Sequence, residues 1–112
     1  MRSIVGRRVP GVVVMVREIG KPDMPLKHVL RHSPDGFEWG YGGSGPADLA
    51  LAILREVFCI DPKCKELADK YYLRFKVAVV QKLPRDQFEI TEAEIRQALT
   101  GIVGAEIRDI LT

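Results

Sequence analysis

A glycine-rich segment with aromatic residues, residues 36–48, is the part of the chain whose residue types are suited to ligand binding. It holds five of the ten glycines and the only tryptophan, and an apolar stretch with helical spacing follows it. Pro46 fits the first turn of that helix, because a missing N–H is no loss there. Backbone N–H groups at a helix N-terminus bind anions. The segment therefore predicts a loop that holds a phosphate or a carboxylate.

Two familiar nucleotide-binding motifs are not met by this loop. Gly40, Gly42 and Gly45 have the spacing G-x-G-x-x-G, and Asp61 follows Gly40 by 21 residues. However, no clear strand leads into Gly40, and the chain is too short for a doubly wound dinucleotide domain. The P-loop pattern also fails, since no lysine follows the last glycine. The sequence thus predicts a site that holds an anion on backbone N–H groups but matches neither the dinucleotide-binding motif nor the P-loop motif.

The predicted ligand-binding residues surround this loop, and an aromatic ring there would stack on a base. They are His32, Glu38, Trp39, Gly40, Tyr41, Gly42, Gly43, Ser44 and Gly45. Asp48, expected in the same first helical turn, and Glu38 would both repel an anion. A structural interpretation stays open, in which the glycines let the loop pass tightly over a sheet. Phe37 and Trp39 would then fill the core.

Acid–base chemistry would fall to His32 and Glu38, if the loop brought them together. Ser44 is a weaker nucleophile candidate, because proline stands where the nucleophile motif needs its last glycine. Ser44 or Gly45 is instead expected to be the helix N-cap. His28 is expected at the surface. Neither a metal site nor a cofactor is expected, because no residues have the spacing of metal ligands.

Composition predicts one domain over residues 1–112. Residues 1–32 carry a net charge of +5, residues 33–60 carry −3, and the remainder is neutral. The basic third would attract a phosphate-bearing partner or form an ordinary solvated face, while nucleic acid is not expected. No apolar stretch is long enough to span a membrane, and no leader sequence is evident, so a cytoplasmic protein is expected. Cys59 and Cys64 are then expected to be free thiols.

The elements that position the loop follow from local patterns. Residues 3–8 and 12–17 predict two strands, and residues 26–31 a short third strand after a loop. Asp61 and Pro62 open a second helix, although residues 72–80 also alternate as a strand would. Helical spacing that begins ten residues earlier favours a helix there. Residues 87–90 predict a strand, and the capping box at 91–94 opens a helix that Gly101 ends.

The expected fold is α+β, a small antiparallel sheet from the N-terminal half packed against two or three helices. The block from His32 to Ala52, HSPDGFEWGYGGSGPADLALA, resembles an uncharacterised family of small bacterial and phage proteins. Looser similarity reaches Gly6, Tyr72 and Leu83-Pro84, so the resemblance covers about residues 4–95. Residues 100–112 are expected to be a C-terminal extension. The resemblance implies a phage or mobile-element setting and brings no activity with it.

The leading functional hypothesis is a small non-enzymatic binding protein with an anionic or nucleotide-like ligand on the loop. The first alternative is a protein-interaction module that inhibits a host defence complex through the basic N-terminal third. The second alternative is an enzyme that uses His32 and Glu38.

Overall fold

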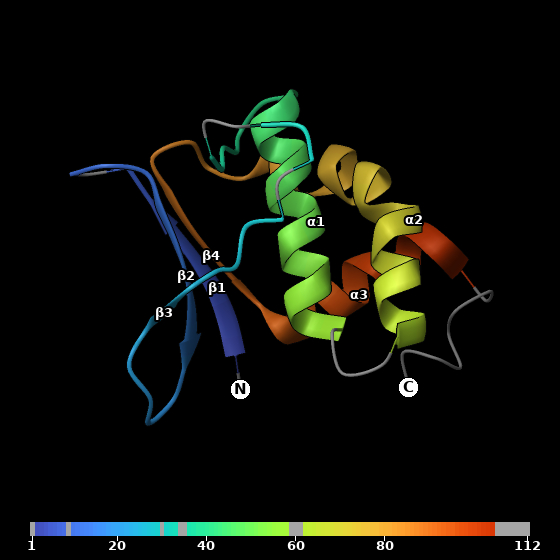
Figure 1. Ribbon diagram of the computed structural model, residues 1–112, viewed down its shortest axis with the longest axis horizontal. Coiled ribbons are helices and arrows are strands. Elements are labelled where there is room, and N and C mark those ends of the chain that lie inside the picture. The colour runs from blue at the N-terminus through green and yellow to red at the C-terminus, as the bar shows by residue number, and fades with distance from the viewer. Residues whose placement is uncertain (1, 9, 30, 34–35, 59–61, 105–112) are drawn as a thin grey trace.

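The strands form one antiparallel sheet in the order β3-β2-β1-β4. In the computed structural model, which describes residues 2–8, 10–29, 31–33, 36–58 and 62–104, the strands are β1 (Arg2–Arg7), β2 (Val13–Glu18), β3 (Met24–Pro25) and β4 (Gln87–Thr91). The last strand pairs with the first, which places Phe88 opposite Gly6. Three helices pack with this sheet, so the expected α+β class is confirmed (Figure 1).

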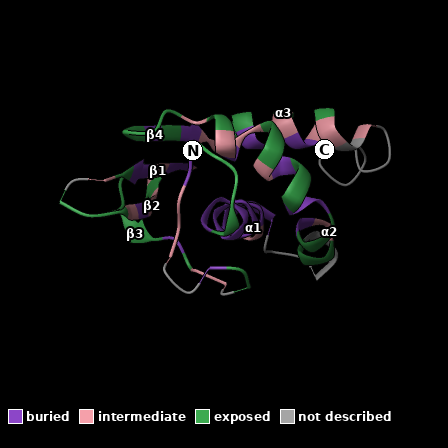
Figure 2. Ribbon diagram, turned by 90° about the horizontal axis from the view of Figure 1, so that it is seen from above, coloured by how far each residue is buried: buried purple, intermediate pink, exposed green. Residues whose placement is uncertain are grey.

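The central element is helix α1 (Ser44–Phe58), which lies against one face of the sheet (Figure 1). Twelve of its 15 residues are buried, which explains its almost continuous apolar sequence. Helices α2 (Pro62–Ala78) and α3 (Glu92–Val103) complete the core around it (Figure 2). A short 3₁₀ helix, η1 (Val80–Lys82), leads from α2 toward β4.

Several local predictions are confirmed. Residues 72–78 continue α2 as a helix, with Phe75 fully buried. The capping box is formed in both directions: the Thr91 hydroxyl accepts from the N–H of Glu94 at 3.1 Å, and the Glu94 carboxylate accepts from the N–H of Thr91 at 3.0 Å. The backbone N–H of Thr91 and the Thr91 hydroxyl both donate to the Glu94 carboxylate and hold its pKa below the ordinary value. The cap fixes the direction in which α3 leaves β4.

Three predicted boundaries were wrong. The described part of residues 26–31 forms no strand, since the chain leaves the sheet once the Leu26 N–H has donated to the Val14 carbonyl. Helix α1 begins at Ser44, and the carbonyl of Gly43 accepts its first hydrogen bond. Gly43 has φ +154°, a conformation that favours glycine, and therefore replaces Ser44 or Gly45 as the cap. Helix α3 continues through Gly101 and ends at Gly104, whose φ is +65°.

Other predictions fall outside the described residues. Cys59 and Asp61 lie there, as do the side chain of Cys64 and residues 105–112 of the expected C-terminal extension. Among the described helices, none is both long and apolar enough to cross a membrane.

Candidate ligand-binding loop at the start of α1

The first half of the glycine-rich block belongs to the core. Trp39 is fully buried, and its indole N–H donates to the Pro84 carbonyl at 2.9 Å. Its ring meets Phe88 edge-on, with 4.9 Å between the ring centroids. A tryptophan packed in this way has no face left for a base, so Trp39 serves the structure of the loop.

Arg8 joins the loop to the segment before β4. Its guanidinium lies 4.3 Å from the centre of the Trp39 ring and donates to the Trp39 carbonyl at 3.1 Å. The same group pairs with the Glu38 carboxylate at 2.5 Å and donates to the Arg85 carbonyl. We call this set of contacts the Arg8 clamp. It uses the planar, forked geometry that distinguishes arginine from lysine.

Two glycines in the block are required by close packing. Gly40 has φ +84°, and a Cβ there would lie 2.6 Å from the Arg85 Cγ. Its N–H donates to the Val80 carbonyl at 3.0 Å, which joins the loop to η1. A Cβ at Gly45 would lie 2.7 Å from the Cβ of Glu38. Both glycines therefore allow backbone to approach where any side chain would collide.

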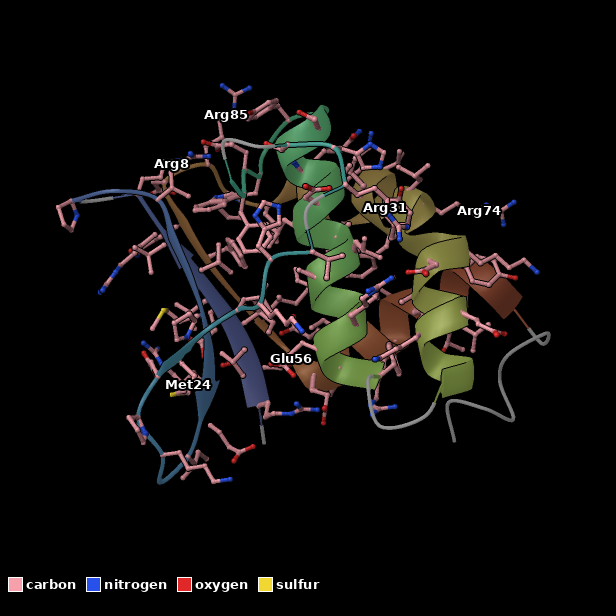
Figure 3. The ribbon with its side chains drawn as sticks, in the orientation of Figure 1. Arg8, Met24, Arg31, Glu56, Arg74 and Arg85 are labelled. Carbon is pink, nitrogen blue, oxygen red and sulfur yellow. The ribbon has the colours of Figure 1, made fainter. Side chains whose placement is uncertain are left out.

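The second half of the block is exposed. Residues 41–44 lie at the surface, whereas residues 45–54 of α1 are buried. Within the described residues, the N–H groups of Gly42, Gly43, Ser44 and Gly45 donate no hydrogen bond, as expected at a helix N-terminus. The Arg85 guanidinium lies 5.9 Å from the centre of the Tyr41 ring and donates to the Gly40 carbonyl at 3.2 Å. Figure 3 shows Arg85 projecting outward at this end of the molecule.

Comparison with protein families places this block in context. A family model described as a family of unknown function, DUF6166, matches residues 4–101. The chain belongs to the DUF6166 family. No curated protein and no solved structure matches it. The resemblance inferred from the block is thereby confirmed. The family match ends at residue 101, a few residues beyond the expected limit at about residue 95.

Asp48 has a different role from the one expected of it. It lies in the second turn of α1 and is fully buried. Its carboxylate accepts from the backbone N–H groups of residues 31, 32 and 33 at 3.3, 3.0 and 3.0 Å, and from the His28 Nε2 at 2.8 Å. Burial alone would raise its pKa, but these hydrogen bonds outweigh burial and hold the pKa below its ordinary value. An ionised Asp48 therefore organises the segment before the loop.

The two acid–base candidates have separate partners. The His32 ring contacts the Tyr72 hydroxyl at 2.6 Å, while Glu38 belongs to the Arg8 clamp. His28 is only partly exposed, because it packs on Phe37 as well as on Asp48, and it was expected at the surface. Among the described residues, no three side chains of the metal-binding types gather into a metal site.

Arg8 and Arg85 were not among the predicted site residues. Nothing in their sequence neighbourhoods marks them, because each acts on a loop about 30 to 45 positions away. Asp48 did carry a signal. It is the only charged residue in the stretch from Pro46 to Leu54, which is otherwise apolar. A carboxylate in a buried helix must be hydrogen-bonded, and partners outside the helix follow from that.

Proposed function

We propose that this DUF6166 protein binds a small anionic, nucleotide-like ligand on the exposed tip of the loop, residues 41–44. The observation that carries the proposal is the coincidence of free backbone N–H groups with an aromatic ring and a guanidinium. The N–H groups of Gly42 and Gly43 lie at the positive end of α1. Arg85 and Tyr41 lie beside them.

Each part of the tip has a chemical counterpart in such a ligand. Backbone N–H groups and the helix dipole suit a phosphate. Arg85 adds a full positive charge and up to two parallel hydrogen bonds to phosphate oxygens. Tyr41 is 42% exposed and offers a ring face on which a base can stack. Trp39 cannot do so, because it is fully buried.

The acidic residues near the tip already have partners, which removes the objection that they would repel an anion. Glu38 is neutralised by Arg8 at 2.5 Å. The Asp48 carboxylate is directed to the segment before the loop, where four donors surround it. Arg85 has no carboxylate partner within the described residues and keeps its charge for a ligand.

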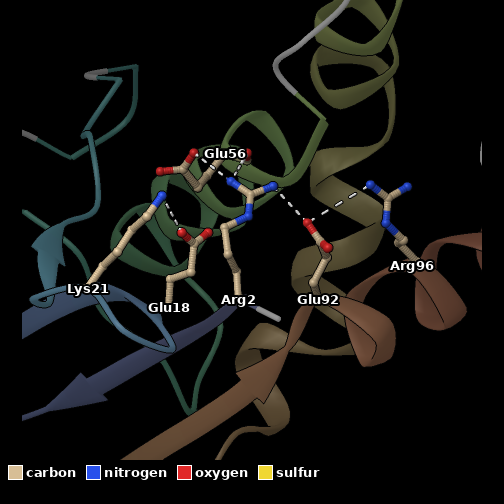
Figure 4. A network of polar contacts seen from close by, with 6 residues as sticks. All are labelled: Arg2, Glu18, Lys21, Glu56, Glu92 and Arg96. Atoms are coloured by element: carbon tan, nitrogen blue, oxygen red, sulfur yellow. Dashed lines mark hydrogen bonds and ion pairs between the residues drawn. The ribbon is translucent and has the colours of Figure 1, made fainter.

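The alternative of a protein-interaction module has less support. Five of the seven basic residues in positions 1–32 form ion pairs within the chain. Figure 4 shows two of these pairings, with Arg2 between Glu56 and Glu92 and Lys21 against Glu18. A surface whose cations are paired internally attracts an acidic partner weakly.

Thermal melts against a panel of nucleoside mono-, di- and triphosphates test the proposal. A ligand at 100 times its Kd stabilises the native state by about 2.7 kcal/mol, which raises the Tm of a domain of this size by roughly 10 °C or more. The uncharged nucleosides should give no shift. If no nucleotide in the panel changes the Tm, the proposal is wrong.

Two variants locate the effect. Arg85→Gln and Tyr41→Ala should each reduce the nucleotide-induced shift while leaving the Tm of the free protein nearly unchanged, because both side chains are exposed. Lys82→Gln removes one positive charge from a neighbouring exposed position and is the matched control. In a phage or mobile-element setting, a cytoplasmic protein of this kind would serve to sequester a signalling nucleotide of the host.

A further inference from the structure

A cleft of about 280 Å³ lies along the second half of α1, away from the loop. Its walls come from the segment after β3, from α1 and from the beginning of α2. The residues that line it are Leu26, Lys27, Val29, Ala52, Arg55, Glu56 and Lys65. This volume is just below the usual range for small-molecule sites, so an occupant would be small.

The floor of the cleft is apolar and its rim is positively charged. Leu26 and Ala52 are buried core residues, and partly buried Val29 packs against the same core. Lys27 and Lys65 are exposed and come from two different walls, one from the segment after β3 and the other from α2. A ligand that matches both features needs a short apolar body and one negative charge.

The charges on the rim do not cancel. Arg55 is held by Asp69 on α2 at 2.7 Å. Glu56 is held by Arg2 at 3.4 Å (Figure 4). Within the described residues, neither Lys27 nor Lys65 has a carboxylate partner. Both ammonium groups are therefore available to an anion above the apolar floor.

We infer that this cleft binds a small organic carboxylate with an aromatic or short aliphatic body. The apolar part would cover Leu26 and Ala52, and the carboxylate would lie between Lys27 and Lys65. Burial of the apolar part contributes roughly 25 cal/mol per Å² of covered surface, which an inorganic anion cannot use. The cleft is separate from residues 41–44, and the inference does not depend on the function proposed for them.

Three probes separate charge from apolar contact. They are 2-naphthoate, the uncharged 2-naphthalenemethanol, and inorganic phosphate, each titrated into ¹⁵N-labelled full-length protein and followed by backbone amide NMR shifts. We expect 2-naphthoate to shift the amides of residues 26–29 and 52–56. The other two probes should bind at least about tenfold more weakly, since 2-naphthalenemethanol lacks the negative charge and phosphate lacks the apolar body.

Paired variants test the role of the lysines. Lys27→Gln with Lys65→Gln should weaken 2-naphthoate about tenfold, since each exposed ion pair contributes up to about 1 kcal/mol. Lys76→Gln with Lys82→Gln changes the net charge equally, outside the cleft, and should leave the affinity unchanged. All four side chains are partly or fully exposed, so the variants should fold, as circular dichroism will check.

Three results would overturn the inference. One is the absence of any 2-naphthoate binding at concentrations up to about 10 mM, at which even a very weak ligand would be detected. Another is a set of shifts confined to residues outside the cleft. The third is equal loss of affinity in the two double variants, which would mean that net charge alone attracts the probe.

Discussion

Replacing Asp48 with asparagine removes the charge that holds residues 31–33 against α1. Asparagine keeps the size of the side chain but retains one acceptor oxygen, so at least one of the four donors now facing Asp48 loses its partner. A buried donor without an acceptor costs about 1–3 kcal/mol, and hydrogen bonds to a charged acceptor are about twice as strong as neutral ones. We therefore expect Asp48→Asn to lower the free energy of unfolding by about 2–4 kcal/mol at pH 7.

The cost should depend on pH in a definite direction. The pKa of Asp48 in the native protein is below its ordinary value. As the pH falls below about 4, the unfolded carboxylate takes up a proton before the native one does. The stability that Asp48 contributes is thus complete above the unfolded-state pKa and is lost as the pH falls through the native-state pKa. Asparagine resembles the protonated acid, so the gap between wild type and variant should narrow in acid.

Urea denaturation followed by tryptophan fluorescence measures both effects, because the only tryptophan, Trp39, is fully buried. Asp69→Asn is the matched control: Asp69 is 39% exposed and pairs with Arg55 and Arg31. Exposed pairs of this kind contribute about 1 kcal/mol or less. The reasoning is refuted if Asp48→Asn costs no more than Asp69→Asn. It is also refuted if the gap between wild type and Asp48→Asn stays constant from pH 7 to pH 3, within an error of about 0.5 kcal/mol.

Three further substitutions test the packing in the same urea assay. Gly6→Ala places a Cβ against the Phe88 ring and should destabilise the protein by about 1–3 kcal/mol. Gly101 lies inside α3, and a Cβ there would have no neighbouring atom within 4 Å. Gly101→Ala should therefore stabilise the protein by about 0.5–1 kcal/mol. Stabilisation by Gly6→Ala would contradict the contact with Phe88, and destabilisation by Gly101→Ala would contradict the open surroundings of Gly101. Thr91→Ala removes the α3 cap and should cost about 1 kcal/mol; no change would mean that Glu94 suffices without it.

Local chemistry made some elements predictable from the sequence. The capping box at Thr91 and Glu94 involves residues three apart, and helical spacing over α2 begins well before the ambiguous residues 72–80. The third strand was misplaced for a long-range reason. Residues 31–33 donate to Asp48, which is 15 to 17 positions later, and a pattern within residues 26–31 contains no sign of that partner.

The block that the sequence predicts as a ligand site contains residues that packing alone requires, beside the exposed residues proposed to bind a ligand. Trp39 and Gly45 have the residue types of a binding loop, yet buried contacts with Pro84 and Glu38 account for both. What remains for a ligand is the exposed tip, and the side chain that would complete it, Arg85, comes from beyond η1.

The Arg8 clamp holds the base of the loop whose exposed tip is residues 41–44. Arg8 binds the carbonyls of both Trp39 and Arg85, so it fixes the base of the loop relative to the residue that would contact an anion. A ligand held by backbone N–H groups needs those groups in place beforehand, since ordering them on binding would cost conformational entropy. Rigid packing of Trp39 and Gly40 would therefore support the recognition proposed for residues 41–44. The buried half of the block would then position the ligand site proposed for the exposed half. Replacement of Arg8 should therefore weaken ligand affinity, although Arg8 itself would make no contact with the ligand.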